Sequence, residues 1–311
     1  MNTLRIGIAG WAYKDWEGIV YPPQLKRKQH PVEYLAQFLD LIEINTSFYG
    51  HIKPESGKLW CRKAAAMNAH FVFTAKLNKC FTHSPLAVLE PTSARTIKPN
   101  TEDEKLAKAG LDAVAGEGRL GALLMQFPVS FKNTEENRNY LDSLLLRFRE
   151  YPRVVEIRHA SWNEQAALQH LGELGVGFCN LDQPLIGRSL GRTSHATAAI
   201  GYIRLHGRNY EQWFTAERVH DRYDYLYNEE ELTRWKPRIE SVAHKTDVTF
   251  VVANNHFRGK AVVNALQLRH MLSARRVRVP EPLVKRYPEL ERIVDEGNGA
   301  EKYETHSLER D

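Results

Sequence analysis

Eight short apolar segments recur along the chain, separated mostly by longer amphipathic ones. The strand candidates are residues 4–9, 41–45, 70–76, 120–126, 153–158, 176–181, 200–206 and 247–254. Helix-like segments lie near 31–39, 54–67, 102–116, 134–149, 163–173, 229–244 and 259–273. Such alternation builds parallel βα units, and about 250 residues of them is the usual size of an eight-stranded barrel. The pattern predicts an α/β fold, a single parallel eight-stranded (β/α)8 TIM-like barrel.

An open, doubly wound sheet is the alternative arrangement of the same units. The first strand leads only into GIAG at 7–10, a weak match to the GxGxxG of dinucleotide-binding sheets, so we favour the barrel. We expect the barrel over residues 1–276 and a C-terminal extension with a frayed end over 277–311. The polar segments 181–199 and 207–228 are predicted to be long functional loops.

The composition excludes several classes of protein. Hydrophobic residues make up 42% of the 311 and charged residues 26%, so a large core is possible and general disorder is excluded. No apolar run approaches the roughly 20 residues of a membrane span. The N-terminus resembles no signal peptide, and three cysteines are too few for a disulfide framework, so we expect a soluble, cytoplasmic protein. The net charge of +5 permits an anionic ligand without requiring nucleic acid.

Polar side chains gather at the strand ends, which meet at one mouth of a barrel, where barrel enzymes build their active sites. The alternation of side chains points Glu43, Glu156 and Arg204 inward, opposite their apolar neighbours. The catalytic candidates are Glu43, Lys76, Glu156, Asp182 and His206. The substrate-binding candidates are Trp11, Asn45, Tyr49, His83, Gln126, Arg158, Trp162, Arg204, Arg208, Asn209, Asn254 and Asn255.

These charges have two interpretations. Any single pair, such as Glu156 with Arg158, could belong to a satisfied ion network that fills the barrel top. Burying many ions costs several kcal/mol for each unpaired one, so together they favour a ligand or catalytic site. Lys76, Arg158 and Arg204 would be the donors to an oxyanion. On that hypothesis an Arg204→Ala variant loses anion binding but little stability.

Three further features leave their alternatives open. Glycines after the seventh and eighth strands, in HGRN at 206–209 and NNHFRG at 254–259, suit an anion site or an ordinary turn. Lys76 could act as a base or a Schiff-base amine if cations lower its pKa, whereas a neighbouring Glu would raise it. The carboxylates with His206 and His256 are suitable metal ligands, but no short ligand motif is present, and the sequence identifies no cofactor.

Aromatic residues are also predicted near the mouth. They are Trp11, Tyr13, Trp16, Tyr21, Phe48, Tyr49, Trp162 and Trp213. Such rings could stack on bases or sugars, although core packing and loop anchoring are the simpler interpretation.

Several of these segments resemble the YecE-like family, also called domain of unknown function 72. The motifs are IAGWAYKDWEGIVYPP at 8–23, EINTSFY at 43–49, FVFTAKLNKCFTH at 71–83, LGALLMQFPVSF at 120–131, VEIRHASW at 155–162, YIRLHGRN at 202–209 and NNHFRGKAVVNA at 254–265. The resemblance covers residues 4–272 and implies a TIM-like barrel. It carries no settled activity, and fold-level similarity to barrel endonucleases is analogy.

We therefore expect an enzyme acting on a small or mid-sized anionic substrate, by acid–base or metal-assisted chemistry of a hydrolase or a lyase/isomerase type. The alternatives are a nucleic-acid-binding or nuclease-like barrel protein and a non-catalytic ligand-binding barrel. A membrane partner is not expected. The sequence determines neither the substrate nor the oligomeric state.

Overall fold

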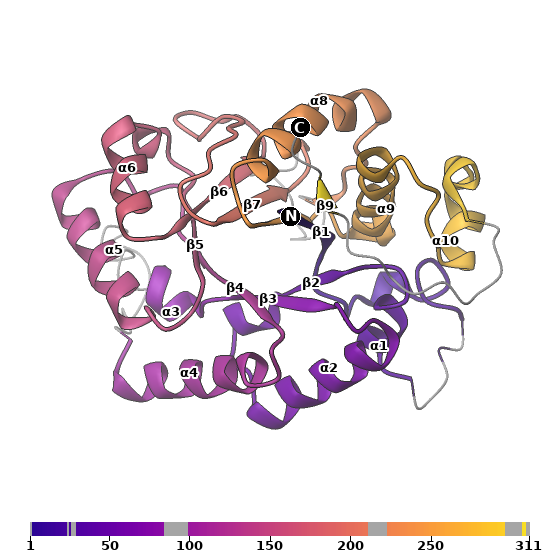
Figure 1. The fold of residues 1–311 in the computed structure, drawn as a ribbon, viewed down its shortest axis with the longest axis horizontal. Helices are drawn as coiled ribbons and strands as arrows, with labels where there is room; N and C mark the ends of the chain where they lie inside the picture. Colours follow the sequence, from indigo (N-terminus) through magenta and orange to yellow (C-terminus); the bar gives the residue numbers. More distant parts are fainter. Residues whose placement is uncertain are drawn as a thin grey trace.

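The computed structural model describes residues 2–23, 25, 29–83, 99–210 and 223–295, and the backbone of 307–308. Its centre is a closed barrel of eight parallel strands, in which neighbours along the chain are neighbours in the barrel and β1 closes it by pairing with both β8 and β2 (Figure 1). The strands are β1 (Asn2–Ala9), β2 (Leu41–Ile44), β3 (Val72–Lys76), β4 (Leu120–Gln126), β5 (Arg153–Glu156), β6 (Gly177–Asp182), β7 (Ile200–Leu205) and β8 (Val248–Ala253). The predicted barrel and all eight of its strands are confirmed.

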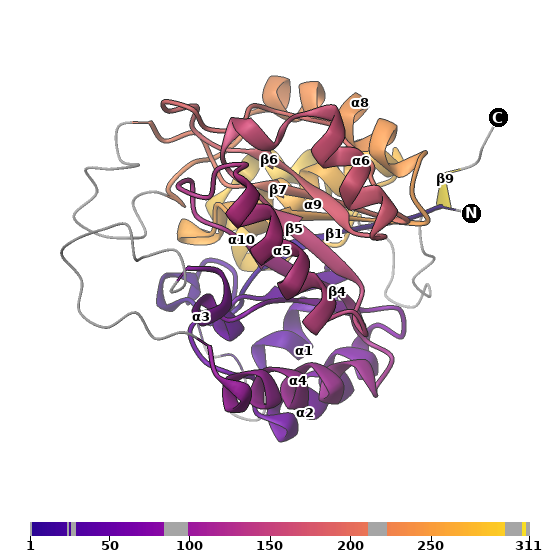
Figure 2. The same cartoon turned by 90° about the vertical axis from the view of Figure 1, so that its left-hand side faces the viewer.

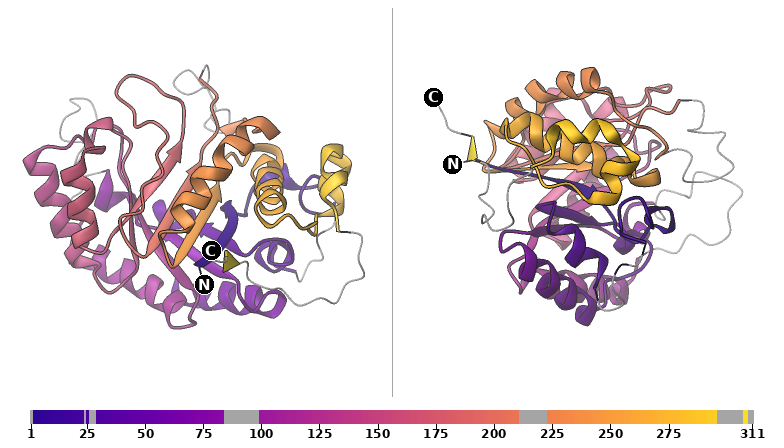
Figure 3. Two further views of the ribbon diagram at one scale, coloured as in Figure 1. Left: turned by 45° about the horizontal axis from the view of Figure 1, so that its top comes forward. Right: turned by 90° about the vertical axis from the view of Figure 1, so that its right-hand side faces the viewer.

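Helices form the outer layer, as Figures 2 and 3 show from two sides. They are α1 (Pro31–Leu35), α2 (Pro54–Met67), α3 (Lys79–Thr82), α4 (Thr101–Ala115), α5 (Glu135–Arg147), α6 (Gln165–Glu173), α8 (Glu229–Ala243) and α9 (Lys260–Ser273). Residues 183–199, between β6 and β7, form a long irregular loop instead of a helix, as the sequence predicts. Part of the second predicted loop, residues 211–222, lies outside the described residues.

Local sequence signals account for where the main helices begin. Pro54 occupies the first turn of α2, where its missing N–H is no loss. The side chain of Asn228 accepts the backbone N–H of Glu231, and the Glu231 carboxylate accepts the N–H of Asn228, which is a capping box. This cap also fixes the position of Glu231, whose carboxylate has a second role at the end of β7.

The barrel interior is apolar toward its N-terminal end and ionic toward the mouth. The rings of Tyr202 and Phe250 lie 5.9 Å apart inside it. Gly121 has no side chain because a Cβ there would lie 2.6 Å from the Phe250 ring. Above this layer Glu43, Glu156 and Arg204 are buried. The alternation along β2, β5 and β7 therefore places these charges inside, as predicted.

The segment after residue 276 packs on the barrel as far as it is described. It contains α10 (Glu281–Arg286) and the 3-10 helix η7 (Pro288–Ile293), and Leu283 and Leu290 are buried in the main core. Strand β9 (Ser307–Leu308) pairs antiparallel with the start of β1. The predicted frayed end falls mostly on residues outside the description. Within the described chain, no helix is long and apolar enough to cross a bilayer.

Candidate functional site

A buried ion network occupies the mouth of the barrel. Arg204 on β7 donates from Nη2 to Oε1 of Glu43 on β2, at 2.6 Å, and from Nη1 to Oε2 of Glu156 on β5. Arg158 donates from Nε and Nη2 to the other oxygen of Glu156, at 2.9 and 2.7 Å. The guanidinium groups of Arg204 and Arg158 hold the pKa of Glu156 well below its usual range, against the effect of burial. Glu156 is therefore held in its ionised form.

Glu43 is held from a second side. The hydroxyl of Tyr202, two residues before Arg204 on the same strand, donates to Oε2 of Glu43 at 2.9 Å. The hydroxyl of Thr74 on β3 lies 2.8 Å from the same phenol oxygen. Sequence reasoning missed both residues, although Tyr202 shares the inward face of Arg204 by simple alternation.

His206 lies at the end of β7 and is buried. Nδ2 of Asn254 lies 3.0 Å from Nδ1 of the imidazole, and Nε2 faces Glu156 at 3.5 Å. Burial, with Arg158 and Arg204 nearby, lowers the pKa of His206 to about 3. His206 is thus neutral at physiological pH, where it can accept at one nitrogen and donate at the other.

Lys76, at the end of β3, differs from the other cations of the mouth. Its Nζ lies 4.0 Å from the centre of the Phe48 ring, and the residue is 7% exposed. Among the described ion pairs, those of Glu43 and Glu156 go to arginines or His206 and none involves Lys76. Burial, with the neighbouring Arg204, lowers the pKa of Lys76 to about 7, outweighing the opposite effect of the carboxylates.

His83 lies beside this amine. Its ring contacts Phe48 edge to face, with centroids 5.1 Å apart, and its Nδ1 lies 2.9 Å from the Thr82 hydroxyl. Burial, with the nearby charge of Lys76, lowers the pKa of His83 to about 4. The mouth therefore holds a neutral imidazole next to a titratable amine. Tyr49 is 70% exposed at the same edge.

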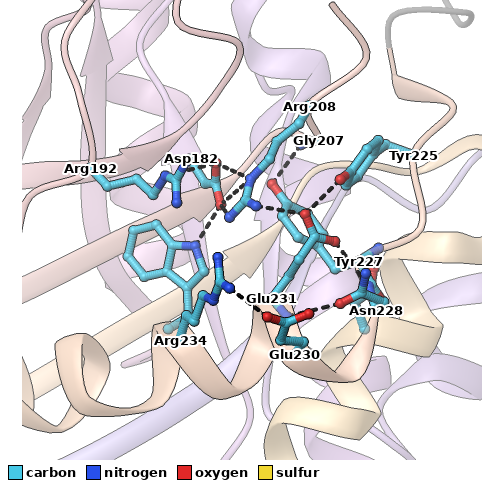
Figure 4. A network of polar contacts seen from close by, with 12 residues as sticks. Asp182, Arg192, Gly207, Arg208, Tyr225, Tyr227, Asn228, Glu230, Glu231 and Arg234 are labelled. Atoms are coloured by element: carbon cyan, nitrogen blue, oxygen red, sulfur yellow. Dashed lines mark hydrogen bonds and ion pairs between the residues drawn. The ribbon is translucent and has the colours of Figure 1, made fainter.

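Asp182 does not join this group, and its own polar contacts are drawn in Figure 4. Its carboxylate accepts Nε and Nη2 of Arg208, at 2.9 and 2.6 Å, and Nε1 of Trp235 on α8, at 2.5 Å. Arg208 in turn donates to Glu231 at 2.6 Å. The expected convergence of Asp182 with the other acids is therefore wrong, because its side chain lies on the helix-facing side of β6.

Polar groups in the loops after β7 and β8 form hydrogen bonds with other protein groups. Gly207 has a φ of 89°, which favours glycine, and its N–H donates to the Tyr227 hydroxyl at 2.9 Å. Nδ2 of Asn255 donates to the Tyr225 carbonyl and to Asn264, both at 2.8 Å. Both loops therefore match the ordinary-turn interpretation more closely than an open anion cradle.

The two buried tryptophan candidates pack away from the network. Trp11 lies edge-on to Trp60 of α2, with centroids 4.9 Å apart. Trp162 donates from Nε1 to the Phe131 carbonyl at 2.9 Å and stacks on that ring. In the described structure both tryptophans make packing contacts, which are the contacts that the simpler interpretation of the aromatics predicts. Trp213 lies outside the described residues.

The remaining candidates border the mouth. Gln126 on β4 is in register with Glu156. The Oδ1 atoms of Asn45 and Asn254 are buried and have no partner among the described residues. Asn209 donates to the Asp224 carbonyl at 3.4 Å. No group of three or more His, Cys, Asp or Glu side chains suited to a metal ion occurs in the described part of the chain.

Comparison with known proteins identifies the family. The model described as "Protein of unknown function DUF72" matches residues 5–288. The chain belongs to the DUF72 family. The match extends past residue 272, where the resemblance seen in the sequence ends, and includes α10.

Relatives in this family share both sequence and fold. The UPF0759 protein YunF of Bacillus subtilis is 26% identical over 279 residues, which cover 86% of this chain and 94% of that protein. A DUF72 family protein of Thermotoga maritima has a TM-score of 0.76 at 32% identity, covering 87% of this chain and 99% of that one. A DUF72 family protein of Enterococcus faecalis has a TM-score of 0.72 at 23% identity, over 87% of this chain and 95% of that one.

The partners of Asp182 and Arg208 outside the mouth carried no signal in the sequence. Glu231 and Trp235 lie on α8. The amphipathic pattern of this helix indicates only that Glu231 is on its polar side and that Trp235 is on its core-facing side. Their contacts with Arg208 and Asp182 depend on α8 crossing the ends of β6 and β7.

Proposed function

We propose that the protein is an enzyme acting on a small anionic substrate at the mouth of the barrel, with Lys76 as the general base. The observation that carries the proposal is the amine of Lys76, which is buried against Phe48 and forms no ion pair within the described residues. A base is most effective when its pKa lies near the working pH, and the pKa of Lys76 is about 7.

The neighbours of Lys76 support this role. Glu43 and Glu156 are held in place by Arg204, so they can stabilise the ammonium that forms when Lys76 takes a proton, without moving. The neutral His83 packs on the same Phe48 ring as the Lys76 amine, and a neutral imidazole can accept or donate a proton. The Oδ1 atoms of Asn45 and Asn254 have no partner among the described residues and can accept hydrogen bonds from substrate hydroxyls.

Arg158 is the cation that suits an anionic group of the substrate. Its side chain is 16% exposed, whereas Arg204 is 1% exposed and directs both terminal nitrogens at carboxylates. Lys76, Arg158 and Arg204 against Glu43 and Glu156 leave one positive charge when Lys76 is protonated. A carboxylate or phosphate would balance that charge. We therefore assign the ligand to Arg158 in preference to Arg204, which the sequence had suggested as a main donor.

The test combines turnover with chemical labelling of amines. We expect phosphorylated or carboxylated substrates in a panel to be turned over by the parent and by Lys79→Met, a control at an exposed lysine on α3. Lys76→Met should lose at least about 100-fold in rate, the usual effect of removing a general base. The same anions should protect Lys76 from acylation, measured by peptide mass spectrometry.

Two results would contradict the proposal. One is equal turnover by the parent and Lys76→Met. The other is acylation of Lys76 that no anion in the panel slows. Protection without turnover would instead support the alternative of a non-catalytic ligand-binding barrel.

A further inference from the structure

A second candidate site lies on the outer side of the barrel, between α8 and the loop that follows β6. It is a cleft of about 460 Å³. Four arginines line it: Arg192 from that loop, Arg208 from the end of β7, and Arg234 and Arg238 from α8. Ser194 and Ser241 add hydroxyl groups, and the described lining contains no Asp or Glu. None of the mouth cations lines this cleft, so it is distinct from the proposed active site.

Two of these arginines form ion pairs with carboxylates. Asp182 and Glu231 bind Arg208, whose side chain is 11% exposed. Arg234 pairs with Glu230 on the same helix. In Figure 4 the side chains of Arg192, Arg208 and Arg234 are drawn around Asp182 and the start of α8. The contacts of Arg208 reduce the entropy that a ligand would otherwise have to overcome in ordering this side chain, whereas the exposed Arg234–Glu230 pair restrains its arginine little.

The other two arginines form no close ion pair within the described residues, so their N–H groups can bind a ligand. Nε of Arg192 lies 3.9 Å from Asp182, beyond hydrogen-bond distance, and its side chain is one-third exposed. No ion pair in the described part of the chain involves Arg238, which lies one helical turn after Arg234. Four guanidinium groups against Asp182, Glu230 and Glu231 leave a net charge of +1. The surplus lies on Arg192 and Arg238, at the open side.

We infer that this cleft binds the phosphate group of a small organic phosphate. Guanidinium groups match phosphate oxygens with paired N–H donors, and serine hydroxyls complete such sites. A phosphate ion alone would fill only a fraction of 460 Å³, whereas pockets of about 300–1,000 Å³ are typical for small organic ligands. The inference goes beyond the proposed function and does not depend on it.

Trp235 provides a probe of this cleft alone. It lines the cleft, and its indole N–H donates to Asp182. The chain has six tryptophans, so ¹⁵N-tryptophan labelling gives few indole signals, and the Trp235→Phe variant assigns the relevant one. At constant ionic strength, we expect inorganic phosphate at millimolar concentration to shift this signal in a saturable manner, whereas chloride should not.

Matched variants locate the binding. The Arg192→Ala/Arg238→Ala double variant should weaken the phosphate-dependent shift of Trp235 at least tenfold. Both side chains are at least partly exposed, so the fold should be retained. Arg138→Ala, at an exposed arginine on α5, should bind as the parent does. Arg158→Ala, in the mouth, should also leave the Trp235 shift unchanged.

Three outcomes would overturn the inference. The first is a Trp235 signal that phosphate leaves unchanged in the parent. The second is a shift that persists in the double variant or disappears in Arg158→Ala. The third is a response to micromolar single-stranded DNA but not to phosphate, which would assign the cleft to nucleic acid. Failure of the mouth chemistry, measured on Lys76, would leave all of these outcomes unaffected.

Discussion

Arg204 and Glu43 meet across the interior of the barrel, with Nη2 of the arginine 2.6 Å from Oε1 of the glutamate. One comes from β7 and the other from β2, and both side chains are essentially buried. The contact links β2 to β7 across the barrel interior at the mouth. It also explains why the charges nearer to solvent, on Lys76 and Arg158, are the ones we assign to a ligand.

Replacing Arg204 should therefore affect stability first. Arg204→Ala leaves Glu43 and Glu156 without their shared buried partner, and breaking such a network costs about 3–5 kcal/mol. The free energy of unfolding, measured with urea, should fall by that amount. Arg234→Ala is the control, because its pair with Glu230 is exposed and such pairs contribute at most about 1 kcal/mol. Equal losses in the two variants would be inconsistent with the buried network.

Lys76 should make stability rise with pH. Its pKa is about 7 in the folded protein and near 10.4 in an unfolded chain. Between these values the unfolded chain binds the extra proton, so the unfolding free energy increases with pH, by at most about 1.4 kcal/mol per unit. Lys76→Met should remove this rise between pH 7 and 9, relative to the parent. Parallel pH profiles for the two proteins would mean that Lys76 keeps an ordinary pKa.

His206 should remain neutral throughout the physiological range. Its pKa of about 3 predicts that its ring resonances, followed by NMR, do not titrate between pH 5 and 8. The unfolded chain gains a proton on this side chain below about pH 6.5, so stability should fall as the pH drops from there toward 3. His206→Asn should lessen that loss. Titration of the ring near pH 6.5 in the parent would contradict the burial argument.

Asp182 should act on structure and not on turnover. Asp182→Asn keeps an oxygen for the Trp235 indole but removes the charge that Arg208 requires. We expect a loss of about 1–3 kcal/mol in the free energy of unfolding, the cost of an unsatisfied partner at a charged hydrogen bond. Turnover of any substrate found for the mouth should stay within about twofold of the parent. A large loss of turnover without a loss of stability would instead indicate that Asp182 is part of the active site.

The predicted direction of a side chain at the mouth was correct where the alternation of residues along a single strand is enough to determine it. Glu43, Glu156 and Arg204 each lie between apolar neighbours that face the helices, so their inward direction follows from the two-residue period of a strand. The prediction for Asp182 was wrong because it used only the position of the residue at a strand end. It did not consider on which face of β6 the side chain lies. Asn180 on that same face also bonds outward, to the loop residues Thr193 and His195, so the polar side of β6 faces the loop and helix layer.

The sequence by itself determined the barrel, because eight strands with helical connections and no uncovered edge leave few other closed arrangements. It also gave the inward direction of Glu43, Glu156 and Arg204, but not the outward direction of Asp182. Only the tertiary structure decided which charges neutralise one another. Arg204 could have faced a ligand, but β2 and β5 bring two carboxylates to it, while no described carboxylate lies within ion-pair distance of Lys76. Such pairing depends on distances between residues more than 40 positions apart, which no local pattern records.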